Sequence, residues 1–283
     1  MENSNKRKTL KRQAGSIVRR CLMLLFGVKF TDGAFISARV LLERRSAANA
    51  YEVLRLEAQP SVVTVNKVPP AADSDKQEEK AGEAADAEPV PRVSMDFAPL
   101  QELCPNIKGW LFAEGTNVDY PVVQTDNNDY YLTHLYNGEA NASGALFLDY
   151  RNNDLFMDRN TVIYGHHMMN GSMFGSLNLY KEQDFYDEYP TMLLYTPDGD
   201  YLVELICGTV EDGNYEFVRF NFDDEDDFCS YIESRRSRST FRSNVEIGPE
   251  DRIISLCTCS YEWNNARYMI MGKLTPIMED PTR

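Results

Sequence analysis

Short apolar runs separated by turn-forming residues dominate the chain from about residue 95 onward. Each run is rich in Val, Ile, Leu and Tyr, and Gly, Asn, Asp or Pro bounds it, which is the pattern of a strand between two turns. Because there are about seven such runs and no regular helical crossovers between them, the pattern favours a mostly antiparallel barrel or sandwich. The runs are DYPVVQT (119–125), GALFLDY (144–150), TVIYG (161–165), MLLYTP (192–197), YLVELICGTV (201–210), RIISLCTC (252–259) and YMIMGKL (268–274).

Three segments have the spacing of helices instead. Within the strand-rich region we expect helices over 126–136 and 223–238. The second of these places apolar side chains such as Phe228 and Ile232 on one face and begins with acidic residues, which the dipole of a helix favours at its N-terminus. A third helix is predicted over 43–57, where good helix formers recur with apolar spacing.

The composition changes sharply over residues 58–93. This stretch is rich in Ala, Pro, Glu, Asp and Lys and contains no aromatic residue, so it cannot bury enough apolar surface to fold by itself. We therefore expect three parts. These are a basic N-terminus with a candidate membrane anchor and helix over 1–57, a disordered acidic, Pro- and Ala-rich tether over 58–94, and one globular domain over 95–283.

Charge is distributed unevenly between the N-terminus and the remainder. Residues 1–20 carry seven Lys and Arg against one Glu, a net charge of +6, whereas the whole chain has −15, which leaves −21 beyond residue 20. An acidic surface repels phosphate and offers no counterion release, which argues against a nucleic-acid partner.

The basic flank precedes the apolar stretch 21–42, which suggests an N-terminal membrane anchor or an uncleaved signal. A membrane span needs about 20 mainly apolar residues, and Lys29, Asp32 and Arg39 interrupt this one. The alternative is an amphipathic helix that packs elsewhere.

Candidate chemistry lies near the ends of predicted strands. His166 and His167 follow one strand, Cys259 closes another, and Arg267 opens the next. A thiol nucleophile needs an imidazole or a cation near its thiolate and a positive group for the developing oxyanion, and these three residue types supply those roles. Each residue also has an ordinary structural explanation, as a buried thiol, a salt-bridge arginine or a structural histidine. A zinc site with Cys257 is awkward, because adjacent histidines on a strand point to opposite faces.

The six cysteines, at positions 21, 104, 207, 229, 257 and 259, show no repeating zinc-type spacing and are too sparse for a disulfide scaffold. We therefore expect free thiols.

Two motifs resemble a known family. LCTCSYEWNNAR (256–267) resembles the active-site pattern of the sortases, and TVIYGHHMMNGSMFGSL (161–177) is similar to the histidine segment of their class B. The resemblance continues upstream through GWLFAEGTNVDYPVVQTDNNDYYLTHLYNGEANASGALFLDYRNN (109–153) and covers about 95–275. It implies a mostly β fold, a closed sortase-type barrel of about seven to eight strands with a few peripheral helices.

The resemblance also implies roles for single residues. Cys259 matches the nucleophile, Arg267 the group that stabilises the oxyanion and the substrate carbonyl, and His166, directly after the glycine, the general acid and base. His167 is then a supporting neighbour. The class B pattern often has serine where this chain has Cys257, which would share a strand face with the nucleophile.

Two further positions are expected to bind substrate. By the same resemblance Thr258 would lie beside the substrate threonine, and Tyr164 would line the same floor.

The implied activity is a cysteine transpeptidase that needs neither a metal nor an organic cofactor. It would cleave a C-terminal sorting motif of a secreted protein after threonine and join the acyl group to an amine of peptidoglycan or of a pilin. The enzyme would sit at the cell membrane of a Gram-positive organism, with a cytoplasmic N-terminus and an extracellular catalytic domain. Two alternatives remain, a sortase-like binding or assembly module without turnover and a cysteine peptidase that only hydrolyses.

Overall fold

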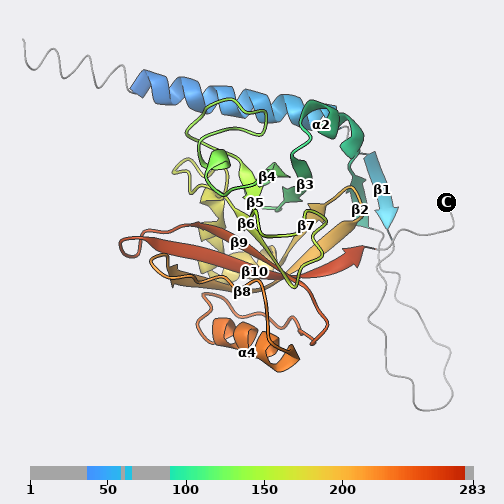
Figure 1. The fold of residues 1–283 in the computed structure, drawn as a ribbon, viewed down its shortest axis with the longest axis vertical. Helices are drawn as coiled ribbons and strands as arrows, with labels where there is room; N and C mark the ends of the chain where they lie inside the picture. The colour runs from blue at the N-terminus through green and yellow to red at the C-terminus, as the bar shows by residue number, and fades with distance from the viewer. Residues whose placement is uncertain (1–36, 59–60, 66–89, 278–283) are drawn as a thin grey trace, which may run out of the picture. The chain divides into compact units, whose positions relative to one another are not determined.

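The computed structural model describes residues 37–58, 61–65 and 90–277 (Figure 1). The chain divides into two compact units, Met1–Asn49 and Ala50–Arg283, and the strands belong to the second unit. Residues 37–57 are helical, as the spacing over 43–57 predicts.

Eight strands of the second unit close into a barrel in the order β10-β8-β7-β3-β4-β5-β6-β9. Most neighbours are antiparallel, but β4 pairs with β5 and β6 pairs with β9 in parallel. The closed barrel implied by the family resemblance is therefore confirmed. The strands are β3 (Ile107–Phe112), β4 (Asp119–Val123), β5 (Leu146–Leu148), β6 (Asn160–Tyr164), β7 (Thr191–Tyr195), β8 (Asp200–Asp212), β9 (Ile253–Cys259) and β10 (Ala266–Ile277).

One barrel strand, β3, is absent from the seven predicted runs. It contains Gly109, which lowers strand propensity. The structure explains the glycine, since a Cβ there would lie 2.9 Å from the Phe156 ring and 3.0 Å from the carbonyl oxygen of Tyr195. Close packing against the Phe156 ring and the main chain of β7 therefore requires a residue that the local pattern disfavours.

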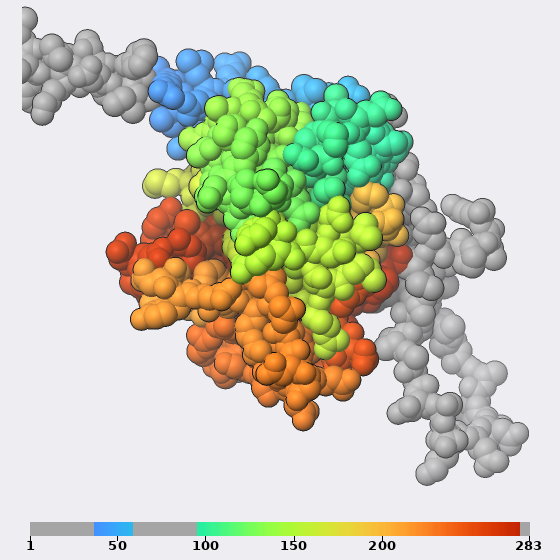
Figure 2. All heavy atoms as spheres, in the orientation of Figure 1, coloured from blue at the N-terminus to red at the C-terminus, as the bar shows by residue number. Residues whose placement is uncertain are grey.

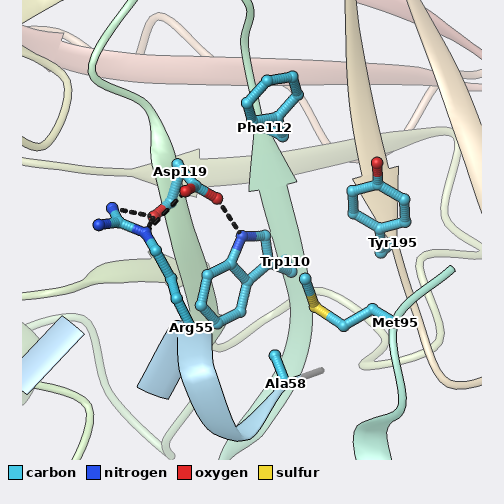
Figure 3. A pocket seen from close by; sticks show the side chains of 7 residues that line it. All are labelled: Arg55, Ala58, Met95, Trp110, Phe112, Asp119 and Tyr195. Atoms are coloured by element: carbon cyan, nitrogen blue, oxygen red, sulfur yellow. Dashed lines mark hydrogen bonds and ion pairs between the residues drawn. The ribbon is translucent and has the colours of Figure 1, made fainter. Parts of the chain in front are cut away.

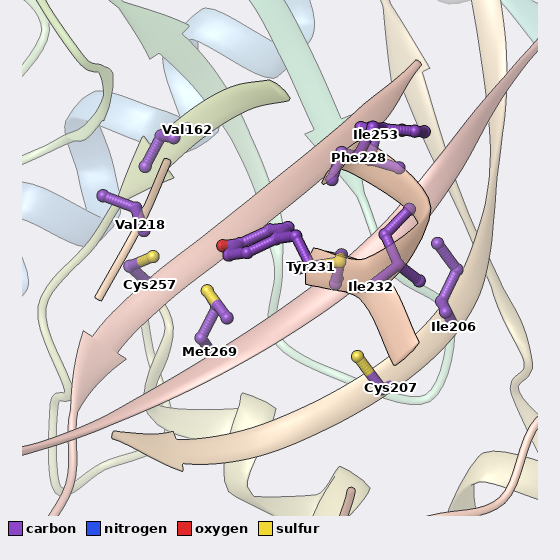
Figure 4. Close-up of a cluster of buried hydrophobic side chains, with 11 residues drawn as sticks. Val162, Ile206, Cys207, Val218, Phe228, Tyr231, Ile232, Ile253, Cys257 and Met269 are labelled. Atoms are coloured by element: carbon purple, nitrogen blue, oxygen red, sulfur yellow. The ribbon is translucent and has the colours of Figure 1, made fainter. Parts of the chain in front are cut away.

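The predicted helix over 223–238 is present as α4 (Glu225–Arg236). The side chain of Asp224 caps it by accepting a hydrogen bond from the Asp227 amide, acidic residues fill the first turn and arginines the last. Its apolar face, with Phe228 and Ile232, packs on β8, β9 and β10 beside the buried thiol of Cys257 (Figure 4). Figure 2 shows α4 and its flanking segments as the orange part of the surface.

The predicted helix over 126–136 is wrong. Only a single 3₁₀ turn, η1 (Tyr130–Leu132), forms there. The cause is Asn127, whose side-chain oxygen accepts hydrogen bonds from the backbone amides of Asp129 and Tyr130, both at 2.9 Å. Such local bonds compete with the helical ladder and favour a turn. Short helical elements that the pattern did not predict are α2 (Phe97–Leu103), η2 (Gly175–Lys181) and α3 (Gln183–Glu188).

The two ends of the segment expected to be a tether are strands. β1 (Ser61–Val65) pairs with β2 (Val90–Ser94) in an antiparallel ribbon, and residues 66–89 lie outside the described residues. Most of the candidate anchor, up to residue 36, lies outside them as well. Among the helices that the structure describes, none has the length and apolar character needed to cross a bilayer.

Candidate active site

Cys259 and Arg267 lie directly opposite each other on the neighbouring strands β9 and β10. Directly opposed residues of an antiparallel pair project from the same face of the sheet, so the thiol and the guanidinium share one face. Both side chains are partly exposed. The turn after β8 packs on the arginine, since a Cβ added to Gly213 would lie 3.2 Å from Cζ of Arg267 and 2.7 Å from the carbonyl oxygen of Asn265.

The histidine segment reaches this place because β6 runs parallel to β9. Tyr164, the last residue of β6, is in register with Cys257, and the amide of Gly165 donates to the Cys257 carbonyl at 3.1 Å. The hydroxyl of Thr258 then donates to the carbonyl of Gly165 at 2.8 Å. The segment that carries the two histidines therefore begins at the end of β9, the strand that carries the nucleophile candidate.

His166 and His167 are held by different parts of the chain. Nε2 of His166 lies 2.7 Å from the carbonyl oxygen of Leu132, on η1. Nδ1 of His167 lies 2.9 Å from the carbonyl oxygen of Cys259 itself, and the side-chain nitrogen of Asn178 lies 3.2 Å from both Nδ1 and Nε2. His167 thus has both ring nitrogens engaged within the protein, one of them by the main chain of the nucleophile candidate.

These contacts assign the tautomers by hydrogen-bond geometry. A carbonyl oxygen only accepts, so the ring nitrogen that meets it carries a proton. In neutral His166 the proton is therefore on Nε2, and Nδ1 is the nitrogen that can take up a proton. The Leu132 carbonyl then orients the ring for acid and base chemistry at Nδ1.

Two glycines permit close packing around the segment that carries His166. A Cβ on Gly144, which has φ +60°, would lie 3.1 Å from Cδ2 of His166 and 2.5 Å from the carbonyl oxygen of Tyr131. A Cβ on Gly165 would lie 2.4 Å from Cδ2 of Leu146. Atoms at these distances overlap, so larger residues would displace the segment that carries the histidine.

The two residues expected to bind substrate form hydrogen bonds inside the protein. Thr258 is buried, and its hydroxyl joins the nucleophile strand to Gly165. The hydroxyl of Tyr164 donates to Oδ2 of Asp149 at 3.1 Å, and burial raises the pKa of this tyrosine well above its usual range. Contact of either residue with substrate stays a prediction.

A fully buried carboxylate, Asp149, lies behind this site, and the sequence patterns did not single it out. It accepts hydrogen bonds from Arg151, Asn128 and Tyr164, three of them from Arg151 alone. Burial by itself would raise the pKa of Asp149, but the bonds from Arg151 and Asn128 outweigh it and lower the pKa. The short spacing between Asp149 and Arg151, at a strand end, was the only sequence signal for this pair.

A separate cavity of about 210 Å³ opens between other elements (Figure 3). Trp110 and Phe112 of β3, Tyr195 of β7 and Met95 line it, and the Trp110 indole donates to Asp119 at 2.7 Å. None of its lining residues comes from β6, β9 or β10, so this cavity is distinct from the surroundings of the thiol.

Within the described ranges, no three His, Cys, Asp or Glu side chains converge where they could hold a metal ion.

Several known proteins that this chain resembles are sortase B enzymes. No protein-family model matches the chain. It is 38% identical over 184 residues to sortase B of Listeria monocytogenes, an alignment that covers 64% of this chain and 75% of the relative. Its structure resembles sortase B of Clostridium perfringens, with a TM-score of 0.59, 33% identity and coverage of 62% of this chain and 97% of that one. It also resembles a sortase B complexed with triglycine, with a TM-score of 0.60, 27% identity and coverage of 64% and 86%.

Proposed function

The chain belongs to the class B sortases, a family of cysteine transpeptidases, and from that premise we propose that Cys259 is its nucleophile. In this proposal the enzyme cleaves a C-terminal sorting motif after threonine and transfers the acyl group to an amine. The observation that carries the assignment is the cross-strand register of Arg267 with Cys259. The histidine segment, hydrogen-bonded to the end of the same strand, supports it.

The first half-reaction forms a thioester. The Cys259 thiolate attacks the carbonyl carbon of the substrate threonine, and the negative charge moves to the carbonyl oxygen, where the Arg267 guanidinium stabilises it. Imidazolium His166 then donates the proton on Nδ1 to the leaving nitrogen as the peptide bond breaks. The proton on Nε2 stays on the ring and remains hydrogen-bonded to the Leu132 carbonyl throughout, so the ring keeps its orientation.

The second half-reaction releases the product to an amine. The amine attacks the thioester carbon, Nδ1 of His166 takes its proton, and Cys259 leaves as a thiolate. We propose an amine of peptidoglycan or of a pilin as the acceptor. The sortase B that was solved with triglycine supports an amine of the glycyl type. Water in place of the amine would give hydrolysis.

Exposed apolar side chains close to the two active-site segments suit a peptide substrate. Leu132 precedes the site on η1, Met169 follows the histidines, and Tyr261 and Trp263 lie in the turn after Cys259. The Tyr261 ring meets the His167 ring edge-on at 4.9 Å between centroids. Aromatic surface of this kind contacts extended chains through both apolar area and polar tips.

The location of the enzyme is part of the proposal. Substrates that carry a sorting signal are secreted, so the catalytic domain would face the outside of the cell and the basic N-terminus the cytoplasm. The charge asymmetry of residues 1–20 against the rest supports this orientation.

The test is mass spectrometry of the full chain incubated with a panel of sorting-motif peptides and triglycine. We expect a product that is cleaved after threonine and joined to triglycine, absent with Cys259→Ala and His166→Ala. His167→Ala is the matched control. It should retain measurable turnover, because the His167 ring contacts the main-chain carbonyl of Cys259 and transfers no proton in the proposed mechanism. Hydrolysis alone would indicate a peptidase or a sortase that takes an acceptor other than triglycine. A folded protein whose Cys259 is alkylated but that processes no peptide would indicate a binding or assembly module.

A further inference from the structure

Lys181, the last residue of η2, reaches the turn that begins directly after the nucleophile. Its ammonium donates to the hydroxyl of Ser260 at 2.9 Å and to Oε1 of Glu262 at 2.5 Å. The Ser260 hydroxyl in turn donates to the other carboxylate oxygen of Glu262. Nζ of Lys181 also lies 4.8 Å from the centroid of the Tyr268 ring. These contacts connect segments that are about 80 residues apart.

This cluster lies immediately behind the reacting strand. Ser260 is buried, and its amide donates to the carbonyl of Ala266, so the ladder between β9 and β10 continues one step beyond Cys259. Side chains alternate along a strand, which places the Ser260 side chain on the face opposite to that of Cys259. The Lys181 and Glu262 side chains are only 24% and 34% exposed, so solvent screens their charges incompletely.

Glu262 carries a negative charge at neutral pH. Burial by itself raises the pKa of this carboxyl, but the hydrogen bonds from Lys181 and Ser260 outweigh that effect and lower the pKa to about 2. A carboxylate near a thiolate disfavours it, whereas a compensated ion pair has little net effect.

Resting on the proposed role of Cys259, we propose that Lys181 is a positioning residue: it neutralises Glu262 and ties the 260–265 turn through Ser260. The Cys259 thiolate is thereby protected from the uncompensated negative charge of Glu262, which follows it by three positions in the sequence. Lys181 reaches no reacting atom and acts through these two partners. Other charged or titratable groups on the elements next to Cys259 include Cys257 on β9 itself, Arg267, Tyr268 and Lys273 on β10, Tyr164 on β6 with His166 and His167 after it, and Tyr261 in the turn. On β8 they include Cys207, Asp212 and Glu211, which is paired with Arg235 and Arg238.

The test measures how fast iodoacetamide alkylates Cys259 in the full chain between pH 5 and pH 9, by mass spectrometry of the peptide that contains it. In Lys181→Met we expect the rate profile to move to higher pH and the rate at pH 7 to fall about 3- to 10-fold, as for a shift of half to one pH unit. Lys181→Met combined with Glu262→Gln should return the profile close to that of the wild type, since it removes both charges. The single substitution Lys181→Arg should give the wild-type rate profile, since it keeps the positive charge.

Lys108→Met is the matched control, because Lys108 pairs with Asp154 on elements other than those that carry Cys259. It should leave the profile unchanged. An unchanged profile in Lys181→Met would overturn the inference, and so would a double variant as slow as the single one, since lost packing alone would explain it. Alkylation needs no peptide. Failure of the wild type to process any peptide, with the expected profiles intact, would therefore refute the proposed function and leave the role of Lys181 supported.

Discussion

Replacing Asp149 with asparagine measures how far the barrel depends on one buried carboxylate beside the candidate active site. The carboxylate is fully buried, and its two oxygens accept five hydrogen bonds, from Arg151, Asn128 and Tyr164. Asparagine has nearly the same shape, but only one of its polar atoms can accept. Whichever way the amide turns, at least two donors face an NH₂ group instead of an oxygen.

The expected loss of stability follows from burial. Breaking a fully buried ion pair costs about 3–5 kcal/mol, and each buried donor left without a partner costs about 1–3 kcal/mol. Arg151 is 39% exposed and keeps its contact with Glu216, so water and a second carboxylate recover part of the loss. We therefore expect Asp149→Asn to lower the free energy of unfolding by about 2–4 kcal/mol and the melting temperature by about 5–15 °C.

Urea unfolding followed by tryptophan fluorescence, to which the buried Trp110 contributes, measures this change. Asp154→Asn is the matched control, since Asp154 forms a surface pair with Lys108 and its side chain is 47% exposed, so its loss should cost less than about 1 kcal/mol. Equal destabilisation by the two substitutions would refute the reasoning.

The stability of the protein at acid pH should depend on the same carboxylate. The folded-state pKa of Asp149 is lowered, so its contribution to the free energy of unfolding is fully present above the unfolded-state pKa of about 4. That contribution is lost as the pH falls through the folded-state pKa. The wild type should therefore lose more stability than Asp149→Asn below about pH 4. A parallel loss of stability in the two proteins would contradict this linkage.

Three further outcomes are expected. Arg267→Lys should lose most of the acyl-transfer rate, because a compact ammonium cannot reproduce the planar fork of guanidinium, and full retention in a peptide assay would contradict the assigned role. Gly165→Ala should cost about 1–3 kcal/mol in urea unfolding, since its Cβ would lie 2.4 Å from Leu146, and an unchanged midpoint would contradict the packing. Burial raises the pKa of the Cys257 thiol, so iodoacetamide at pH 8 should label Cys259 before Cys257. Equal labelling of these two thiols in the folded protein would contradict this prediction.

Local patterns were sufficient for most of the elements. Alternating and continuous apolar runs predicted seven of the eight barrel strands, and the acidic start and apolar face predicted α4. They failed where a side chain competes with the backbone, as Asn127 does in the expected helix 126–136, and where a glycine in β3 serves a contact with distant residues. Periodicity reports what each segment buries. It carries no information about which distant atoms fill the space around it.

The residues of the candidate site could also be proposed from the sequence, through motifs that place a histidine, a cysteine and an arginine at strand ends. Their convergence was decided only by the closed barrel, which sets β6 parallel to β9 and puts Arg267 in register with Cys259. The supporting contacts of Lys181 and Asp149 were not predictable, because their partners lie far away along the chain or on separate segments. Strand register is fixed by burying all eight strands together, and a short window of sequence contains none of that long-range packing.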